Sequence, residues 1–339
     1  MGGTSVARAL VDAVRKDFPD PEAGKRPVHA VGIAVTGQFT ASSVACNWCT
    51  AAHFQGQPTP VTVRFSNGSG MPVERDGWSD VRGMATRFHL SDGSATDLVA
   101  MTLREFFSPT VEDFLAFSAA SRMTPVAWES PLSKLLDVLQ LKRPLPNPPP
   151  GQTESGAAGS LGYANHHQPS QLAVFEAGNI GAPVSYARVM FHAVHTFVVT
   201  APDGIRRHVR FHWQPTAGVK LTDPTLPPVA RYLHDELRAR LSRWPVEFLL
   251  MMTLGEAGDV FDDPTRAWPS SRTHVVMGTL RLTAVAEDQA ANCEKLGFNP
   301  CRLTPGIDLS NDPILACRRE AYEVSQQMRG ATPCPFNHG

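Results

Sequence analysis

An arginine and a tyrosine near the end of the chain are spaced for chemistry on one face of a helix. A helix is expected to begin at Asp312, with Asn311 as its N-cap, and it places Arg318 four residues before Tyr322. A guanidinium beside a phenol favours the phenolate, because it opposes the negative charge and donates hydrogen bonds. A phenolate is one of the few protein groups that hold the iron of a ferric haem. The spacing alone is more often that of a solvated arginine and a packed tyrosine, so it needs partners elsewhere in the chain.

Histidine, serine and arginine recur at positions inside predicted strands. His29 follows Arg26 by three residues in a first strand, and Ser66 ends a second strand, where Arg64 shares its face. His195 lies among apolar residues in a fifth strand. Histidine exchanges a proton near neutral pH and is therefore a candidate for acid–base chemistry. Each of these histidines alone is more often a core residue with a satisfied hydrogen bond.

The hydrophobic periodicity indicates the elements that position these residues. Alternating patterns predict eight strands, at residues 26–36, 61–66, 84–90, 97–102, 186–200, 206–214, 246–253 and 274–283. Helical patterns predict helices at 4–17, 109–119, 128–141 and 229–243. A Pro- and Gly-rich connection at 143–160, expected to be extended and exposed, separates two groups of four strands. The fold class is therefore α+β, an eight-stranded antiparallel β-barrel with inserted and flanking helices, because closure leaves no strand edge unpaired.

Composition excludes several classes of function. The chain has 339 residues, 42% of them hydrophobic, and a net charge of −1, which argues against a nucleic-acid groove or a polybasic membrane patch. The opening residues lack a secretory signal, and no apolar run approaches the roughly 20 residues of a spanning helix. A soluble, cytoplasmic protein is expected. The six cysteines, at 46, 49, 293, 301, 317 and 334, are too scattered for a disulfide framework, and a redox or metal role for the C-x-x-C at 46–49 stays a minority alternative.

Together, the short motifs of this chain resemble the core motifs of the haem catalases. In chain order they are Arg26-Pro-Val-His29, Val63-Arg64-Phe-Ser66, Asp80-Val-Arg-Gly83, Asp97-Leu-Val, Phe106-Phe107, His195-Thr-Phe, Val209-Arg-Phe-His-Trp, Trp268-Pro, the Phe298-Asn-Pro…Pro305-Gly-Ile turn and Arg318-x-x-x-Tyr322. The resemblance covers about residues 25–330, a single haem domain preceded by a helix and lead-in at 1–24 and followed by a tail at 331–339. The short chain looks like the small catalase-related peroxidases.

The resemblance implies a proximal side built on Tyr322. Tyr322 would be the iron ligand and Arg318 the group that keeps it a phenolate. His195 and Asp312 match the family positions that continue this line, in which the carboxylate orients the imidazole and the imidazole contacts the guanidinium.

The resemblance also implies how haem b would be held. Arg26, Arg64 and Arg329 fall on the family's three arginines for the haem propionates, which need cationic partners when buried. Phe114 is the candidate for an aromatic ring packed against the macrocycle.

On the distal side, His29 would be the general acid–base and Ser66 would hold its ring. Thr102 occupies the position of the family's distal asparagine. A threonine lacks the amide donor, so orienting a second hydrogen peroxide is the step expected to suffer, whereas cleavage of the first peroxide bond should survive.

The resemblance therefore implies a haem peroxidase that reduces organic hydroperoxides and hydrogen peroxide, with weak catalase activity. An unidentified small-molecule reductant and a homo-oligomer, taken as a dimer, are the expected partners. One alternative is a hydroperoxide-rearranging haem enzyme of the allene oxide synthase type, against which Val28 before His29 argues. The other is a non-enzymatic haem or lipid carrier, which would not need His29 with Ser66.

Overall fold

The computed structural model describes residues 3–16, 25–70, 75–77, 80–121, 124–125, 152–153, 160–223 and 229–330. The lead-in at 17–24, the predicted helix at 128–141, most of the connection at 143–160 and the tail at 331–339 lie outside these residues.

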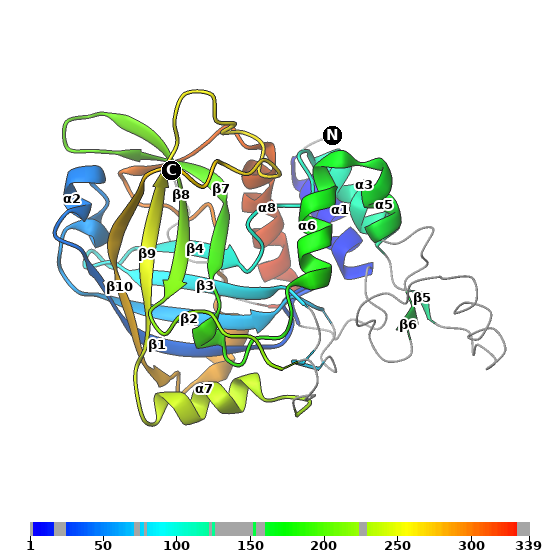
Figure 1. The fold of residues 1–339 in the computed structure, drawn as a ribbon, viewed down its shortest axis with the longest axis horizontal. Helices are drawn as coiled ribbons and strands as arrows, with labels where there is room; N and C mark the ends of the chain where they lie inside the picture. Colours follow the sequence, from blue (N-terminus) through cyan, green and yellow to red (C-terminus); the bar gives the residue numbers. More distant parts are fainter. Residues whose placement is uncertain are drawn as a thin grey trace.

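Eight antiparallel strands close into a barrel (Figure 1). They are β1 (Gly32–Ala41), β2 (Thr59–Asn67), β3 (Arg82–His89), β4 (Ala95–Met101), β7 (Phe191–Thr200), β8 (Arg206–Pro215), β9 (Val246–Leu254) and β10 (His274–Val285). Each strand pairs with the next in this order, and β10 pairs back onto β1. The predicted eight-stranded barrel is confirmed. The short strand β11 (Ile307–Leu309) extends this sheet by pairing with β7, and β5 (Thr124–Pro125) and β6 (Gln152–Thr153) form a separate two-stranded sheet.

Most of the helices gather on one side of the barrel (Figure 1). This group contains α1 (Gly3–Lys16), α3 (Val111–Ala120), α5 (Ser160–His166), α6 (Gln168–Asn179) and α8 (Pro313–Met328), while α2 (Ala45–Trp48) and α7 (Leu233–Leu241) lie at other edges. Short helical turns occur at Ala52–Phe54, Tyr186–Arg188 and Ala290–Lys295. Helix α1 packs on α8 through Ala7, Val11 and Val324. Within the described parts of the chain, no helix has the length and apolar character needed to cross a membrane.

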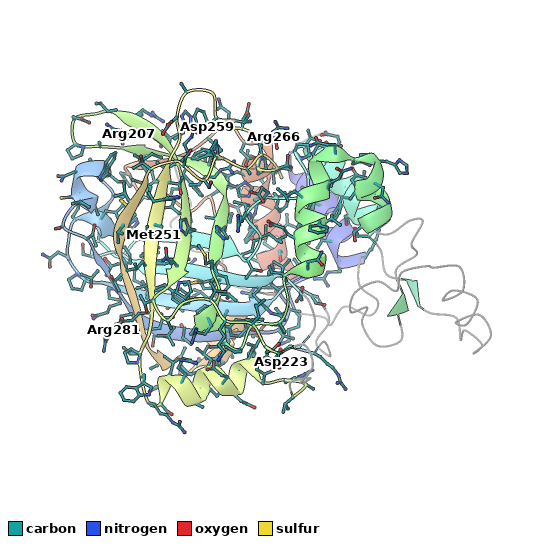
Figure 2. All side chains as sticks on the ribbon, in the orientation of Figure 1. Arg207, Asp223, Met251, Asp259, Arg266 and Arg281 are labelled. Atoms are coloured by element: carbon teal, nitrogen blue, oxygen red, sulfur yellow. The ribbon has the colours of Figure 1, made fainter. Side chains whose placement is uncertain are left out.

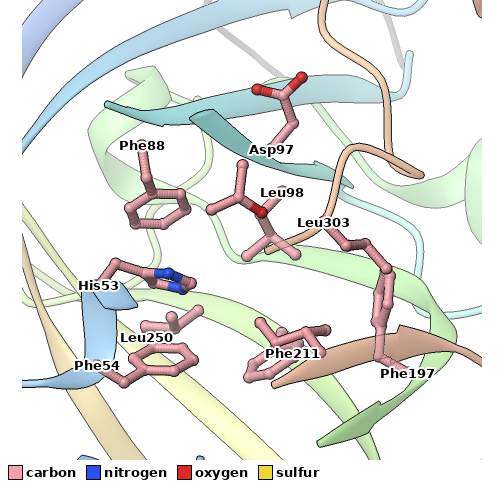
Figure 3. Close-up of a pocket in the computed structure, with 11 residues that line it drawn as sticks. His53, Phe54, Phe88, Asp97, Leu98, Phe197, Phe211, Leu250 and Leu303 are labelled. Carbon is pink, nitrogen blue, oxygen red and sulfur yellow. The ribbon is translucent and has the colours of Figure 1, made fainter. Parts of the chain in front are cut away.

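Large side chains fill the barrel interior, and polar ones project outward. The Phe39 ring meets the edges or faces of Phe54, Phe88 and Trp213 at centroid distances of 5.3–6.2 Å. A small cavity of about 20 Å³ remains in this interior, and His53 faces it (Figure 3). On the outside, Arg281 of β10 points to solvent (Figure 2). The inner and outer faces follow the two-residue alternation of the strands.

Three details differ from the expectations. Strand β1 begins at Gly32, so the predicted strand from residue 26 was wrong at its start, and His29 lies in an irregular segment with φ of 54°. Strand β7 begins at Phe191, and a short helical turn precedes it. Helices α5 and α6 were not predicted, because their small and polar residues give only a weak apolar periodicity.

Candidate active site

A cavity of about 580 Å³ lies between the helices and the outer face of β2, β3, β4 and β7. The predicted site residues that line it are Arg26, His29, Arg64, Ser66, Phe114, Arg318, Tyr322 and Arg329. His195 and Asp312 do not line the cavity, but hydrogen bonds connect Asp312 to His195 and His195 to Arg318, which does. Thr102 is not part of the lining. The volume lies within the range of cofactor pockets, roughly 300–1,000 Å³.

Four residues form a hydrogen-bonded line that ends at the cavity. Asp312 Oδ2 accepts from His195 Nδ1 at 2.6 Å, and Arg318 Nη1 donates to His195 Nε2 at 2.7 Å. Arg318 Nη2 then donates to the Tyr322 oxygen at 2.5 Å. This order fixes the His195 tautomer, because Nδ1 must carry the proton that Asp312 accepts.

Asp312 also begins helix α8. Its Oδ1 accepts from the backbone N–H groups of Ile314 and Leu315 at 2.8 and 3.2 Å. Asp312 is therefore the N-cap, and the expectation that Asn311 would be the cap was wrong. One carboxylate thus uses one oxygen to start the helix and the other to orient His195.

A bulge in β7 directs His195 towards α8. Ala193 pairs with Phe211 and Phe197 pairs with Val209, so β7 has two more residues than β8 across this interval. Such a bulge re-aims side chains that a regular strand would place elsewhere.

The charges along this line are set by burial and by contact. Burial lowers the pKa of His195 to about 4, although Asp312 acts in the opposite direction, so the imidazole is neutral near pH 7. Burial also disfavours the charge on Arg318, but Tyr322 outweighs it and the pKa of Arg318 is raised. Arg318 therefore keeps its positive charge where it donates to the Tyr322 oxygen.

The His29–Ser66 pair lies at the end of β2. His29 Nδ1 is 3.0 Å from Ser66 Oγ. The backbone of His29 is held on both sides, since its N–H donates to Gly68 O and its carbonyl accepts from Arg64 Nη2, each at 2.9 Å. A positive φ on a histidine costs about 1–3 kcal/mol and typically persists where function requires it. Burial, with the charges of Arg64 and Arg318, lowers the pKa of His29 to about 3, so this imidazole is a neutral base.

Gly83 of β3 makes room for this pair. A Cβ atom there would lie 2.8 Å from both His29 Nδ1 and Ser66 Oγ. Sequence reasoning gave Gly83 no role, although the motif that contains it was visible.

Three arginines converge at one end of the cavity. Arg26 Nη1 and Arg64 Nε both donate to Cys293 O, at 2.9 and 3.1 Å, and Arg329 Nη1 donates to Glu294 O at 2.7 Å. The contribution of the 290–295 turn was missed, because no local pattern in that segment indicates its distant partners.

The same arginines raise the local positive charge. Burial and the charges of Arg64 and Arg329 lower the pKa of Arg26, and burial and Arg64 lower the pKa of Arg329 to about 10. The Glu294 carboxylate is 3.8 Å from Arg26 but also lies 3.6 Å from Lys25. A dicarboxylate ligand would relieve this repulsion, so the residues present fit the two propionates of a haem.

The remaining two predicted residues differ in placement. Phe114 lines the cavity and stacks on Phe106 at 5.6 Å. The Thr102 hydroxyl accepts from the backbone N–H of Arg82 at 3.0 Å, and Met101 contributes to the cavity wall instead.

Comparison with known proteins points to one family. The family model described as Catalase matches residues 12–141 and 162–334. A Catalase-related peroxidase of Mycolicibacterium paratuberculosis is 34% identical over 337 residues, covering 97% of this chain and 96% of the relative. A Catalase-related peroxidase of Synechococcus elongatus is 30% identical over 308 residues, covering 90% and 84%. The solved structure of a bacterial catalase has a TM-score of 0.75 at 21% identity and covers 91% of this chain and 58% of that chain, a likeness in fold.

Proposed function

The chain belongs to the catalase family and is an oxidoreductase that acts on peroxide, and on this premise we propose that it is a haem-dependent peroxidase of organic hydroperoxides with weak catalase activity. One observation carries the proposal. A single cavity is reached from α8 by the Asp312–Tyr322 line and from β2 by the His29–Ser66 pair. A phenol held beside a cation and a neutral histidine held by a hydroxyl are the groups that peroxide cleavage on iron requires.

The proposed cofactor is haem b, held by residues of the chain from two directions. The Tyr322 oxygen would bind the iron, and Arg26, Arg64 and Arg329 would receive the propionates. Phe114 would pack against the macrocycle. When bound, the haem would supply the two electrons that split the O–O bond and would regain them from the reductant.

His29 would move the proton in this step. It is neutral above about pH 3, so it can take a proton from the near oxygen of the hydroperoxide and give it to the departing one. Ser66 holds Nδ1 and leaves the other ring nitrogen for this transfer. Overall, a hydroperoxide, two protons and two electrons give an alcohol and water.

Two features support a preference for organic hydroperoxides. Apolar side chains, among them Met101, Phe107 and Phe117, make up much of the cavity wall and suit an organic tail. Met101 rather than Thr102 contributes to the wall here, and its side chain offers no amide donor for a second hydrogen peroxide. We also propose a small-molecule reductant, a homodimer and a cytoplasmic location.

The test compares two activities of the haem-loaded protein. Oxygen release from hydrogen peroxide is measured beside oxidation of a reducing dye driven by an organic hydroperoxide. The proposal expects dye oxidation to dominate and to be lost in His29→Ala with haem still bound. Brisk oxygen release with little dye oxidation would contradict it. An isomerised lipid hydroperoxide formed without reductant would instead support a rearranging enzyme.

A further inference from the structure

The proposed chemistry uses one of the two histidines that line the cavity. His29 lies beside Ser66, whereas His192 on β7 lines the cavity wall and has no part in the steps above. His192 also begins a row of three neighbouring histidines on the outer face of the barrel, which continues with His212 on β8 and His274 on β10. This row is therefore a feature of the site that the proposed function leaves unexplained.

The strand register brings the three rings together. His192 is directly opposite His212, His212 is opposite Met251 of β9, which Figure 2 labels, and His274 is opposite Thr253 of the same strand. The ring centres of His192 and His212 are 5.5 Å apart, and those of His212 and His274 are 5.7 Å apart. The first two histidines are half-buried and His274 is exposed, so the row leads from the cavity to solvent.

The chemical state of the rings suits proton transfer. Burial, with His212 and Arg104 nearby, lowers the pKa of His192 to about 3. Burial and His274 lower the pKa of His212 to about 4. A neutral imidazole donates through one nitrogen and accepts through the other, so it can pass a proton on and return to its starting charge.

The distances between the three histidine rings fit short proton-transfer steps better than they fit a metal site. At ring-centre separations of 5.5 and 5.7 Å, one water molecule between two rings could pass a proton from one ring nitrogen to the next. Thr253 Oγ1, 2.9 Å from His274 Nδ1, orients the outermost ring. Over the residues that the structure describes, no group of three His, Cys, Asp or Glu side chains could hold a metal ion.

We propose that His274, His212 and His192 form a proton path from solvent into the cavity. The inference rests on the proposed function, in which a hydroperoxide takes up two protons and two electrons to give an alcohol and water. Two molecules of an aromatic reductant, each losing one electron and no proton, supply the electrons, so both protons come from solvent. Each proton that enters at His274 is matched by one that leaves His192 for the cavity, so the row gains no net charge. The cavity wall beside His192 is apolar and includes Met101 and Phe107, whose side chains cannot accept and pass on a proton.

The experiment interrupts the row at its centre in the haem-loaded protein. His212→Phe keeps a ring of similar size but cannot relay a proton. His208→Phe is the matched control, because His208 is four residues away on the same strand and stacks on Phe261 at 4.0 Å. Stopped-flow mixing with an organic hydroperoxide and an aromatic reductant measures dye oxidation, and a pH indicator measures proton uptake.

A proton path predicts a specific pattern. In His212→Phe, kcat and proton uptake fall about 10-fold or more, the solvent isotope effect in D2O rises, KM is unchanged, and added imidazole restores the rate. His208→Phe behaves as wild type. Wild-type values of kcat and of the isotope effect in His212→Phe would overturn the proton path and leave the proposed function intact. A decrease in kcat that added imidazole does not restore would do the same. Absence of peroxide reduction in the wild type would overturn both.

Discussion

Asp312 has two roles, and comparing two substitutions distinguishes the helix cap made by Oδ1 from the contact that Oδ2 makes with His195. In Asp312→Ala, helix α8 loses its cap, at about 0.5–2 kcal/mol. The buried Nδ1–H of His195 also loses its partner, at about 1–3 kcal/mol. The free energy of unfolding should therefore fall by roughly 1.5–5 kcal/mol. The side chain is 1% exposed, so water gives little compensation.

Asp312→Asn should keep the helix cap and change only the contact with His195. Asparagine is an equally good cap, so the helix start is kept. Its amide N–H₂ would face His195 Nδ1 and favour the tautomer with the proton on Nε2. That proton would then point at Arg318 Nη1, a donor now 2.7 Å away. Arg318 would be displaced and would no longer hold the Tyr322 oxygen.

The assay compares stability with site chemistry for each variant. Urea unfolding should place Asp312→Ala below Asp312→Asn by about 1 kcal/mol, the value of the cap. Peroxide reduction should fall by about 10- to 100-fold in Asp312→Asn, as is typical when the partner of a ligand-orienting group changes. Asn311→Ala, next to the cap and exposed, should change neither. Wild-type peroxide reduction in Asp312→Asn would refute the orienting role of the carboxylate.

Three further substitutions probe other parts of the cavity and the barrel. Gly83→Ala should separate His29 from Ser66, because its Cβ would lie 2.8 Å from both, and should lower the rate of peroxide reduction by about 10- to 100-fold while haem absorption stays. His53 is buried with no partner for Nδ1, and burial lowers its pKa to about 3 (Figure 3). Below about pH 6.5 the unfolded chain protonates His53 and the folded chain does not. The free energy of unfolding therefore decreases as the pH is lowered, by about 2 kcal/mol near pH 5. In His53→Phe, urea unfolding near pH 5 and at neutral pH should give more similar free energies than in the wild type. Arg329→Leu removes one of three clustered cations and should weaken haem binding by about 10- to 100-fold in a titration, the value of one charged hydrogen bond; unchanged affinity would contradict the propionate role.

The sequence predicted what local periodicity controls. Arg318 and Tyr322 meet because residues four apart share a helix face, and the eight strands follow from two-residue alternation. Asp312 and His195 are 117 residues apart, and only the resemblance to a family joined them before the structure did.

Features that depend on tertiary contacts could not be predicted. The positive φ of His29 is maintained by Gly68 and Arg64, and neither contact is encoded in the residues around His29. The bulge that turns His195 towards α8 depends on how β7 pairs with β8. Thr102 was expected in the cavity by its place in a motif, yet its hydroxyl caps the Arg82 backbone.

The central claim is that the Tyr322 oxygen binds the iron of a haem in this cavity. The most direct measurement is the absorption spectrum of the haem-loaded protein beside those of Tyr322→Phe and Tyr163→Phe. Tyr163 stacks on His167 outside the cavity lining and serves as the control. The account predicts a high-spin ferric Soret band in the wild type and Tyr163→Phe, and its loss in Tyr322→Phe. The same band in all three proteins would contradict it.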